Sequence, residues 1–283
     1  MRGATQRRLR VVTPSTVGEE RYVNAGGQRI RVNVRHGSGV PLVLCNGIGA
    51  SLEVLDPLVE RLRCTVVRFD VPGTGGSPTS LAPYGFPYLA WVLGRVLSKL
   101  GFGVVDVLGL SWGGALAQQF AFQNPRRCRR LVLVATGTGA VMVPAHPRVL
   151  AKMVTPRRFS DPDYAAAIAG ELYGGTVRAH GEDVARLFVR QLHAGSKVGY
   201  LHQLLAGAVW TSVFALPAVR QETLIVAGTD DPIISVINAH VMNALLPHSR
   251  LHLHAGGHID LVHNAEELAP VVERFLSDPG ERA

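Results

Sequence analysis

The segment Gly109–Gly114, with the sequence Gly-Leu-Ser-Trp-Gly-Gly, has the composition and spacing of a serine nucleophile on a tight turn. It lies between the apolar run Val104–Leu108 and the apolar stretch Ala115–Phe122, which predicts a strand before it and a helix after it. Glycine two residues before and after the serine relieves crowding on such a bent backbone. The N-terminus of the following helix can stabilise negative charge that develops beside the hydroxyl. We therefore predict that Ser111 is a nucleophile; the alternative is a turn whose glycines serve only close packing.

A serine hydroxyl needs a base that removes its proton and a third group that orients this base. Among the eleven histidines, His258 fits because it follows the last predicted strand, close to the C-terminus and directly after Gly256 and Gly257. His252 and His254 alternate on that strand, but no cysteine or carboxylate set completes a zinc site with them. We predict His258 as the base, and neither a metal nor an organic cofactor.

Two adjacent aspartates, Asp230 and Asp231, follow the predicted strand that ends at Ala227. In serine hydrolases with a turn of this kind the acid lies between the serine and the histidine in chain order, after a strand. Asp231 precedes a proline, which keeps its backbone out of the helical region and so restricts its carboxylate. We predict that Asp231 is the orienting acid and that Asp230 makes hydrogen bonds within the turn. Asp260 is too near His258 in the chain to orient it easily.

The loop Asn46–Ala50, Asn-Gly-Ile-Gly-Ala, has glycines on both sides of Ile48. An oxyanion needs two backbone donors, one from the residue after the nucleophile and one from a loop after a central strand. We predict the N–H groups of Ile48 and Trp112; the alternative is a loop whose glycines serve only its geometry. The glycine-rich run Asp70–Ser77 lacks a P-loop lysine and is expected to be a structural turn. The residues predicted to contact substrate are Asn46, Gly47, Met142 and Trp210.

Short apolar strands alternate with amphipathic helices along most of the chain. Strands that are apolar on both faces predict an α/β fold with a mostly parallel central sheet and helices on both faces. The reactive loops should then gather at the carboxyl ends of the strands. The expected elements are a hairpin over Val23–Arg35, strands Leu42–Cys45, Thr65–Phe69, Val104–Leu108, Leu131–Val134, Leu224–Ala227 and Leu251–Leu253, and helices Leu52–Leu62, Tyr88–Leu100, Ala115–Gln123, Asn238–Leu246 and Glu266–Phe275.

Residues 138–214 interrupt this alternation with a helical pattern broken by prolines. The stretch is too long for a plain loop between two strands of a sheet, so we expect a helical cap inserted over the strand ends. Residues 20–137 and 215–283 would form the core, and residues 1–19 a basic, flexible tail. The apolar residues of the cap either line a substrate channel or attach the cap to the core.

The net charge of +8 comes almost wholly from arginine, and the hydrophobic fraction of 47% suffices for a large core. No nucleic-acid recognition motif accompanies the charge, so a solvated basic surface is favoured over a nucleic-acid partner. Three scattered cysteines fit reduced thiols better than a disulfide framework. No apolar stretch follows the N-terminal arginines, and no run of about eighteen apolar residues exists. We therefore expect no secretory signal, no membrane span and a cytoplasmic location.

From Val23 onward these features together resemble the α/β-hydrolase superfamily, and within it the intracellular poly(3-hydroxyalkanoate) depolymerases of the medium-chain type. The resemblance implies Ser111, Asp231 and His258 as the triad. It also implies an intracellular polyester of 3-hydroxy acids as the substrate, with work at the surface of storage granules. The segments that carry it are NGIGA at 46–50, FDVPG at 69–73, SWGGALAQQF at 111–120, AVMVP at 140–144, LYGG at 172–175, KVGY at 197–200 and AGAVWTS at 206–212.

Three other functions stay open for these residues. The nearest is hydrolysis of small soluble esters, thioesters or lactones with the same triad. Hydrolysis of a carbon–carbon bond is less supported, because nothing in the predicted cap indicates a dienolate site. A non-catalytic scaffold is also disfavoured, since such proteins usually lack a triad or oxyanion element and here every one is present.

Overall fold

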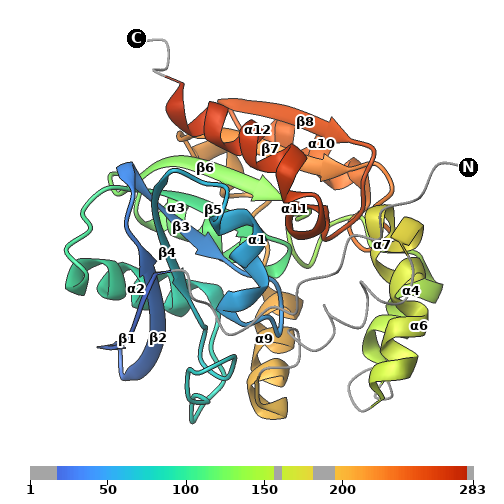
Figure 1. The fold of residues 1–283 in the computed structure, drawn as a ribbon, viewed down its shortest axis with the longest axis horizontal. Helices are drawn as coiled ribbons and strands as arrows, with labels where there is room; N and C mark the ends of the chain where they lie inside the picture. The colour runs from blue at the N-terminus through green and yellow to red at the C-terminus, as the bar shows by residue number, and fades with distance from the viewer. Residues whose placement is uncertain (1–17, 156–160, 181–194, 279–283) are drawn as a thin grey trace, which may run out of the picture.

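The computed structural model describes residues 18–155, 161–180 and 195–278. An eight-stranded sheet in the order β1-β2-β4-β3-β5-β6-β7-β8 runs through the molecule, with helices on both faces (Figure 1). β1 and β2 pair antiparallel, as do β2 and β4, and every other neighbouring pair is parallel. This architecture confirms the predicted α/β fold. The strands are Glu19–Ala25 (β1), Gln28–Arg35 (β2), Ser38–Cys45 (β3), Cys64–Phe69 (β4), Val105–Leu110 (β5), Cys128–Val134 (β6), Glu222–Gly228 (β7) and Ser249–His254 (β8).

Each predicted strand lies within an observed one, except that β5 starts one residue later than predicted and continues to Leu110. β6 starts earlier than its apolar run because Arg129 and Arg130 belong to the strand. The Arg130 guanidinium donates hydrogen bonds to the carbonyls of Phe275 and Leu276, at the end of a helix packed on the sheet. A charged residue with such a tertiary partner extends a strand beyond its hydrophobic pattern.

The helix predicted over Leu52–Leu62 is wrong in its extent. A 3₁₀ turn occupies Leu52–Leu55 and a single α-helical turn follows, because Pro57 has no N–H for the α-helical bond to the Glu53 carbonyl, which accepts from the Asp56 N–H instead. α11 was not predicted. The helices are η1 (Leu52–Leu55), α1 (Asp56–Val59), α2 (Phe86–Lys99), α3 (Trp112–Gln123), α4 (Pro147–Val154), α6 (Pro162–Tyr173), α7 (Gly175–His180), α9 (Lys197–Val209), η2 (Leu216–Ala218), α10 (Val236–Leu245), α11 (Asp260–His263) and α12 (Ala265–Ser277).

The regular elements described between β6 and β7 up to residue 214 are the helices α4, α6, α7 and α9. Figure 1 shows α4, α6 and α7 grouped together and α9 apart from them. Of the predicted tail 1–19, only Gly18 and Glu19 lie within the described residues, and Glu19 is already the first residue of β1.

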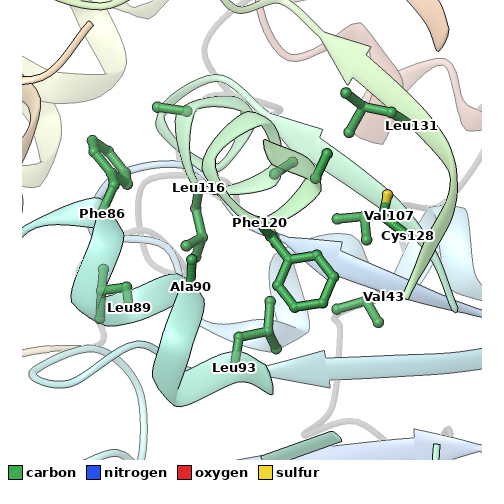
Figure 2. Packing of buried hydrophobic residues seen from close by; sticks show 14 of the residues in the cluster. Val43, Phe86, Leu89, Ala90, Leu93, Val107, Leu116, Phe120, Cys128 and Leu131 are labelled. Carbon is green, nitrogen blue, oxygen red and sulfur yellow. The ribbon is translucent and has the colours of Figure 1, made fainter. Parts of the chain in front are cut away.

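The sheet separates two hydrophobic layers. Along β3, Val43 and Cys45 face the layer of α2 and α3, whereas Leu42 and Leu44 face the layer of α1 and α12, because successive strand side chains point to opposite faces. Phe120 of α3 is fully buried in the first layer, beside Val43 and Leu93 (Figure 2). The three cysteines are free thiols.

Phe120→Ala should lower the free energy of unfolding by about 3–5 kcal/mol, because it removes a large buried side chain and leaves a cavity. Phe122→Ala is the matched control on the same helix, since that side chain is 45% exposed. Urea unfolding followed by circular dichroism measures both. Equal losses for the two variants would contradict this packing.

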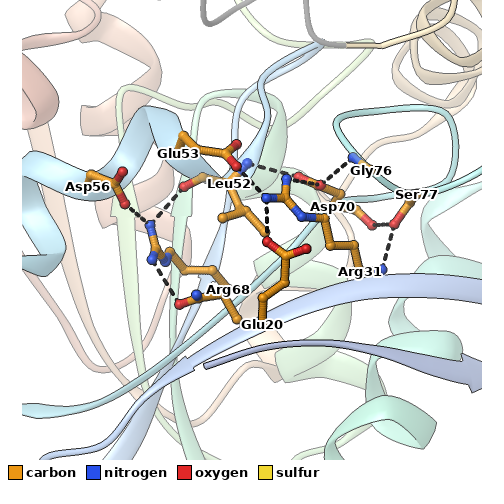
Figure 3. A network of polar contacts seen from close by, with 10 residues as sticks. Glu20, Arg31, Leu52, Glu53, Asp56, Arg68, Asp70, Gly76 and Ser77 are labelled. Carbon is orange, nitrogen blue, oxygen red and sulfur yellow. Dashed lines mark hydrogen bonds and ion pairs between the residues drawn. The ribbon is translucent and has the colours of Figure 1, made fainter. Parts of the chain in front are cut away.

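An ionic network joins β1, β2, β4 and the segment after β3 (Figure 3). It is buried or partly buried except at Glu20, whose side chain is 45% exposed. Arg31 forms ion pairs with Glu20 at 2.6 Å, Glu53 at 2.5 Å and Asp70 at 3.2 Å. Asp70 also accepts hydrogen bonds from the backbone N–H groups of Leu52 and Gly76, both at 2.8 Å. One carboxylate thus holds together the segment that follows the 46–50 loop and the turn 70–77.

A second arginine, Arg68, lies in the same network and is 1% exposed. Its guanidinium pairs with Asp56 and donates hydrogen bonds to Asn33 Oδ1 at 2.8 Å and the Leu52 carbonyl at 3.1 Å. A buried charge needs partners of this kind, because an unpaired one loses its hydration without compensation.

Burial raises the pKa of Asp70 from 3.8 to about 6, although Gly76, Arg31 and Leu52 act in the opposite direction. The folded protein therefore binds a proton at Asp70 more tightly than the unfolded chain does. The contribution of Asp70 to the free energy of unfolding is largest below pH 4 and declines as the pH rises through 6.

Asp70→Asn removes the titrating group and one of the two side-chain oxygens that accept hydrogen bonds from backbone N–H groups. Its destabilisation relative to the parent should therefore be greater at pH 4 than at pH 7, by up to about 3 kcal/mol. Urea unfolding of both proteins at pH 4, 5.5 and 7 measures the difference. A destabilisation that is independent of pH, or larger at pH 7, would contradict the raised pKa.

Candidate active site

Ser111 lies on a strained backbone between β5 and α3, with φ of 54° and ψ of −120°. Positive φ is costly for a residue with a Cβ, and among the described non-glycine residues only Ser111 and Ala135 have it. A Cβ at Gly113 would lie 2.1 Å from the carbonyl oxygen of Cys45, and one at Gly109 would lie 2.4 Å from that of Gly113. The two glycines of the motif therefore prevent collisions with backbone atoms.

Hydrogen bonds from three directions hold this bend. The Ser111 N–H donates to the Val134 carbonyl at 2.9 Å. The Ser111 carbonyl accepts from the Gly114 N–H and from the Thr136 hydroxyl, both at 2.8 Å. The strained conformation is fixed by its neighbours in β6 and α3.

The structure brings Ser111, His258 and Asp231 together at the carboxyl ends of β5, β7 and β8. His258 Nε2 is 2.9 Å from Ser111 Oγ, and His258 Nδ1 is 2.8 Å from Asp231 Oδ2. The side chains of His258 and Asp231 are 5% and 1% exposed. An ionised carboxylate can only accept, so it favours the tautomer with the proton on Nδ1 and a lone pair on Nε2 directed at the serine hydroxyl.

The second oxygen of Asp231 is occupied by the protein backbone. Oδ1 accepts hydrogen bonds from the N–H groups of Ile233 at 2.8 Å and Ile234 at 2.9 Å. Three donors therefore fix the carboxylate, and its orientation toward the imidazole does not depend on solvent.

Asp230 has different partners from its neighbour. Its carboxylate accepts from the Gly175 N–H at 2.8 Å and from the Arg178 guanidinium at 2.7 Å. The prediction that Asp230 bonds within its own turn is wrong, because the packing of α7 against this loop provides the donors. Such a long-range contact has no local signal in the sequence.

The junction between α6 and α7 also contacts the loop that carries His258. The His258 N–H donates to the Tyr173 carbonyl at 2.8 Å. The buried Asp260 accepts a hydrogen bond from the Thr176 hydroxyl at 2.9 Å. One turn of the helical segment thus braces both loops that hold the acid and the imidazole.

The loop 46–50 lies against the serine, since a Cβ at Gly47 would be 3.8 Å from Ser111 Cβ. Asn46 braces the loop: its Oδ1 accepts from the Gly47 N–H at 2.8 Å and its Nδ2 donates to the Ser51 carbonyl at 2.7 Å. Within the described parts of the chain, the N–H groups of Ile48 and Trp112 have no hydrogen-bond partner. Among the described residues these two N–H groups therefore remain available as donors to a ligand.

Trp210 and Met142 lie in packed surroundings. The Trp210 ring is 5.0 Å from that of Phe86, its Nε1 donates to Gln119 at 2.6 Å, and it belongs to the hydrophobic core. Met142 is half-buried beside Gly137. The Trp210 indole thus attaches the end of α9 to the core, and substrate contact by these two residues stays a prediction.

The sequence analysis missed Gln203, Arg178 and Thr176, which contact the loops of the site from the helical segment. Each acts through a partner far away in the chain, so none stands out by spacing. No group of three or more histidine, cysteine, aspartate or glutamate side chains suited to a metal ion occurs among the described residues. None of the helices in that part of the chain is long and apolar enough to cross a membrane.

Comparison with known proteins shows the family of this chain. A family model of the α/β-hydrolase fold matches residues 40–265. The chain belongs to the α/β-hydrolase family. A poly(3-hydroxyalkanoate) depolymerase from Ectopseudomonas oleovorans is 45% identical over 267 residues, which cover 93% of this chain and 94% of that protein.

Two further relatives show how widely this fold is used. The 2-hydroxy-6-oxo-2,4-heptadienoate hydrolase of Pseudomonas putida is 30% identical, over 82% of this chain and 87% of that protein. The crystal structure of the enol-lactonase from Burkholderia xenovorans LB400 superposes with a TM-score of 0.78 at 21% identity, over 91% of this chain and 100% of that one. At this identity the lactonase is evidence for the fold alone.

Asp231→Asn should lower kcat on a soluble nitrophenyl ester by about 10³–10⁴-fold, because an amide at this position can donate to Nδ1 and favour the wrong tautomer. Asp230→Asn is the matched control, and its effect should stay within about 3-fold, since it only weakens the contact with α7. Steady-state kinetics of both variants tests the choice between the two aspartates. A larger loss for Asp230→Asn would reverse the assignment.

Proposed function

We propose that this protein is a serine-triad ester hydrolase that cleaves intracellular poly(3-hydroxyalkanoate) to 3-hydroxy acids. The observation that carries the hydrolase proposal is the hydrogen-bonded chain from Ser111 through His258 to Asp231. The identity of 45% with a poly(3-hydroxyalkanoate) depolymerase, over nearly the whole of both proteins, supports the polyester as substrate.

In the proposed mechanism His258 Nε2 takes the proton of the Ser111 hydroxyl as Oγ attacks the ester carbonyl. The carbonyl oxygen becomes an oxyanion, which the N–H groups of Ile48 and Trp112 stabilise. His258 then protonates the departing alkoxide, which leaves as a hydroxyl chain end, and an acyl-enzyme remains. Water attacks this ester with His258 again as the base; the 3-hydroxy acid is released, and His258 returns the proton to Ser111 Oγ.

Asp231 keeps the Nδ1 proton in place and stabilises the imidazolium that forms in each half of the reaction. The strained backbone of Ser111 holds its Oγ 2.9 Å from His258 Nε2. The N–H groups of Ile48 and Trp112 are the proposed donors to the oxyanion. Side chains, backbone donors and water supply every step of this scheme.

The helical segment between β6 and β7 is proposed to be the cap over this site, and the substrate a polymer with hydrophobic side chains at the surface of a cytoplasmic granule. The outer face of α9 suits such a surface. Four of its apolar side chains are 42–53% exposed, namely Val198, Leu201, Leu204 and Leu205, and Val209 is 83% exposed.

A fluorophosphonate probe should label Ser111 covalently, and Ser111→Ala should abolish both the labelling and the release of 3-hydroxy acids, with a loss of several orders of magnitude in turnover. The test uses suspensions of medium-chain and short-chain polyester, with products identified by mass. Retained activity in Ser111→Ala would refute the serine mechanism. Hydrolysis of nitrophenyl esters without action on either polymer would refute the polyester substrate and favour small soluble esters.

A further inference from the structure

Gln203 of α9 contacts both segments that carry the free backbone donors. Its Oε1 accepts a hydrogen bond from the Gly49 N–H at 3.0 Å, and its carbonyl accepts from Trp112 Nε1 at 2.9 Å. The side chain is fully buried. From this geometry we infer that Gln203 is a positioning residue for the oxyanion hole, an inference that rests on the proposed serine-hydrolase function.

The loop 46–50 needs a restraint from outside. Its N–H groups at Gly47 and Ala50 bond within the loop, to Asn46 Oδ1 and to the Gly47 carbonyl. The Gly49 N–H has only Gln203 as its partner within the described residues, and Gly49 has a φ of +71°. Glycine in that region is conformationally permissive, so the bond to Gln203 restricts the peptide plane directly after Ile48. Without it, the Ile48 N–H loses its fixed direction toward the substrate carbonyl.

Helix α9 is itself anchored firmly enough to provide this restraint. The Ser196 N–H donates to the Gly73 carbonyl at 3.0 Å, and the hydroxyls of Ser196 and Thr79 lie 2.6 Å apart. A Cβ on Gly199 would lie 2.5 Å from the Gly73 Cα, so the two backbones are in direct contact. The first turn of α9 therefore rests on the turn 70–77, which Asp70 holds from the other side.

Gln203 uses different groups to contact the 46–50 loop and Trp112, and its Nε2 donates to the Gly199 carbonyl within α9 at 3.4 Å. The bond to Gly49 uses the side chain, whereas the bond to Trp112 uses the backbone carbonyl. A side-chain substitution therefore removes the support of the Ile48 donor and leaves the contact to Trp112 in place.

Gln203→Met, which keeps the length but loses the acceptor, should lower kcat/KM on a soluble nitrophenyl ester by about 10–100-fold, mainly through kcat, because displacement of one donor weakens transition-state binding. A trifluoromethyl ketone that adds to Ser111 forms an oxyanion in the same hole. The Ki of this ketone should rise by a factor similar to the loss in kcat/KM. General loosening of the fold would not change Ki and kcat/KM by the same factor.

Lys197→Ala is the matched control, since it changes an exposed side chain of the same helix and should keep parental kinetics. If Gln203→Met does not fold, Gln203→Asn takes its place, because its shorter amide cannot reach Gly49 and should show the same loss. The inference is overturned if the folded variant binds the ketone as tightly as the parent, or if Gln203→Asn keeps parental kcat. A parent enzyme that the ketone does not inhibit would instead refute the proposed serine mechanism, so the two failures are distinguishable.

Discussion

The backbone at Ser111 is held at φ of 54° and ψ of −120°, a conformation that costs of order 1–3 kcal/mol for a residue with a side chain. The surrounding structure must supply this free energy. Hydrogen bonds from Thr136 and Gly114 and to Val134 fix the bend, and glycines at 109 and 113 leave room for the neighbouring backbone. The bend sets the position of the Ser111 hydroxyl. His258 and the 46–50 loop can act on a substrate only if the hydroxyl lies where they meet it.

Two parts of the helical segment support the loops around this bend from opposite directions. The α6–α7 junction contacts the acid and imidazole loops through Tyr173, Thr176 and Arg178. Helix α9 contacts the 46–50 loop and Trp112 through Gln203. The core of the sheet thus determines where each loop begins, and the helical segment restricts how each loop lies. A change in the helical segment can therefore reach the site without touching substrate.

Much of the fold was predictable because its signal is local. Apolar runs such as Leu42–Cys45 and Leu224–Ala227 mark buried strands, and their alternation with helices dictates a parallel sheet whose carboxyl ends meet at one edge. The prediction failed where a distant partner decides the structure. Arg130 extends β6, for example, because its guanidinium bonds to carbonyls at the end of α12.

The sequence by itself determined the nature and order of the groups that meet in the site: a serine between glycines, an aspartate before proline and a histidine after the last strand. These residues have local signals, because tight turns and strand ends impose strict demands on neighbouring positions. Only the tertiary structure decided which groups hold them. The pairing of Asp230 with α7, the core position of Trp210 and the bond from Gly49 to Gln203 join segments far apart in the chain, and such contacts depend on packing that no local pattern encodes.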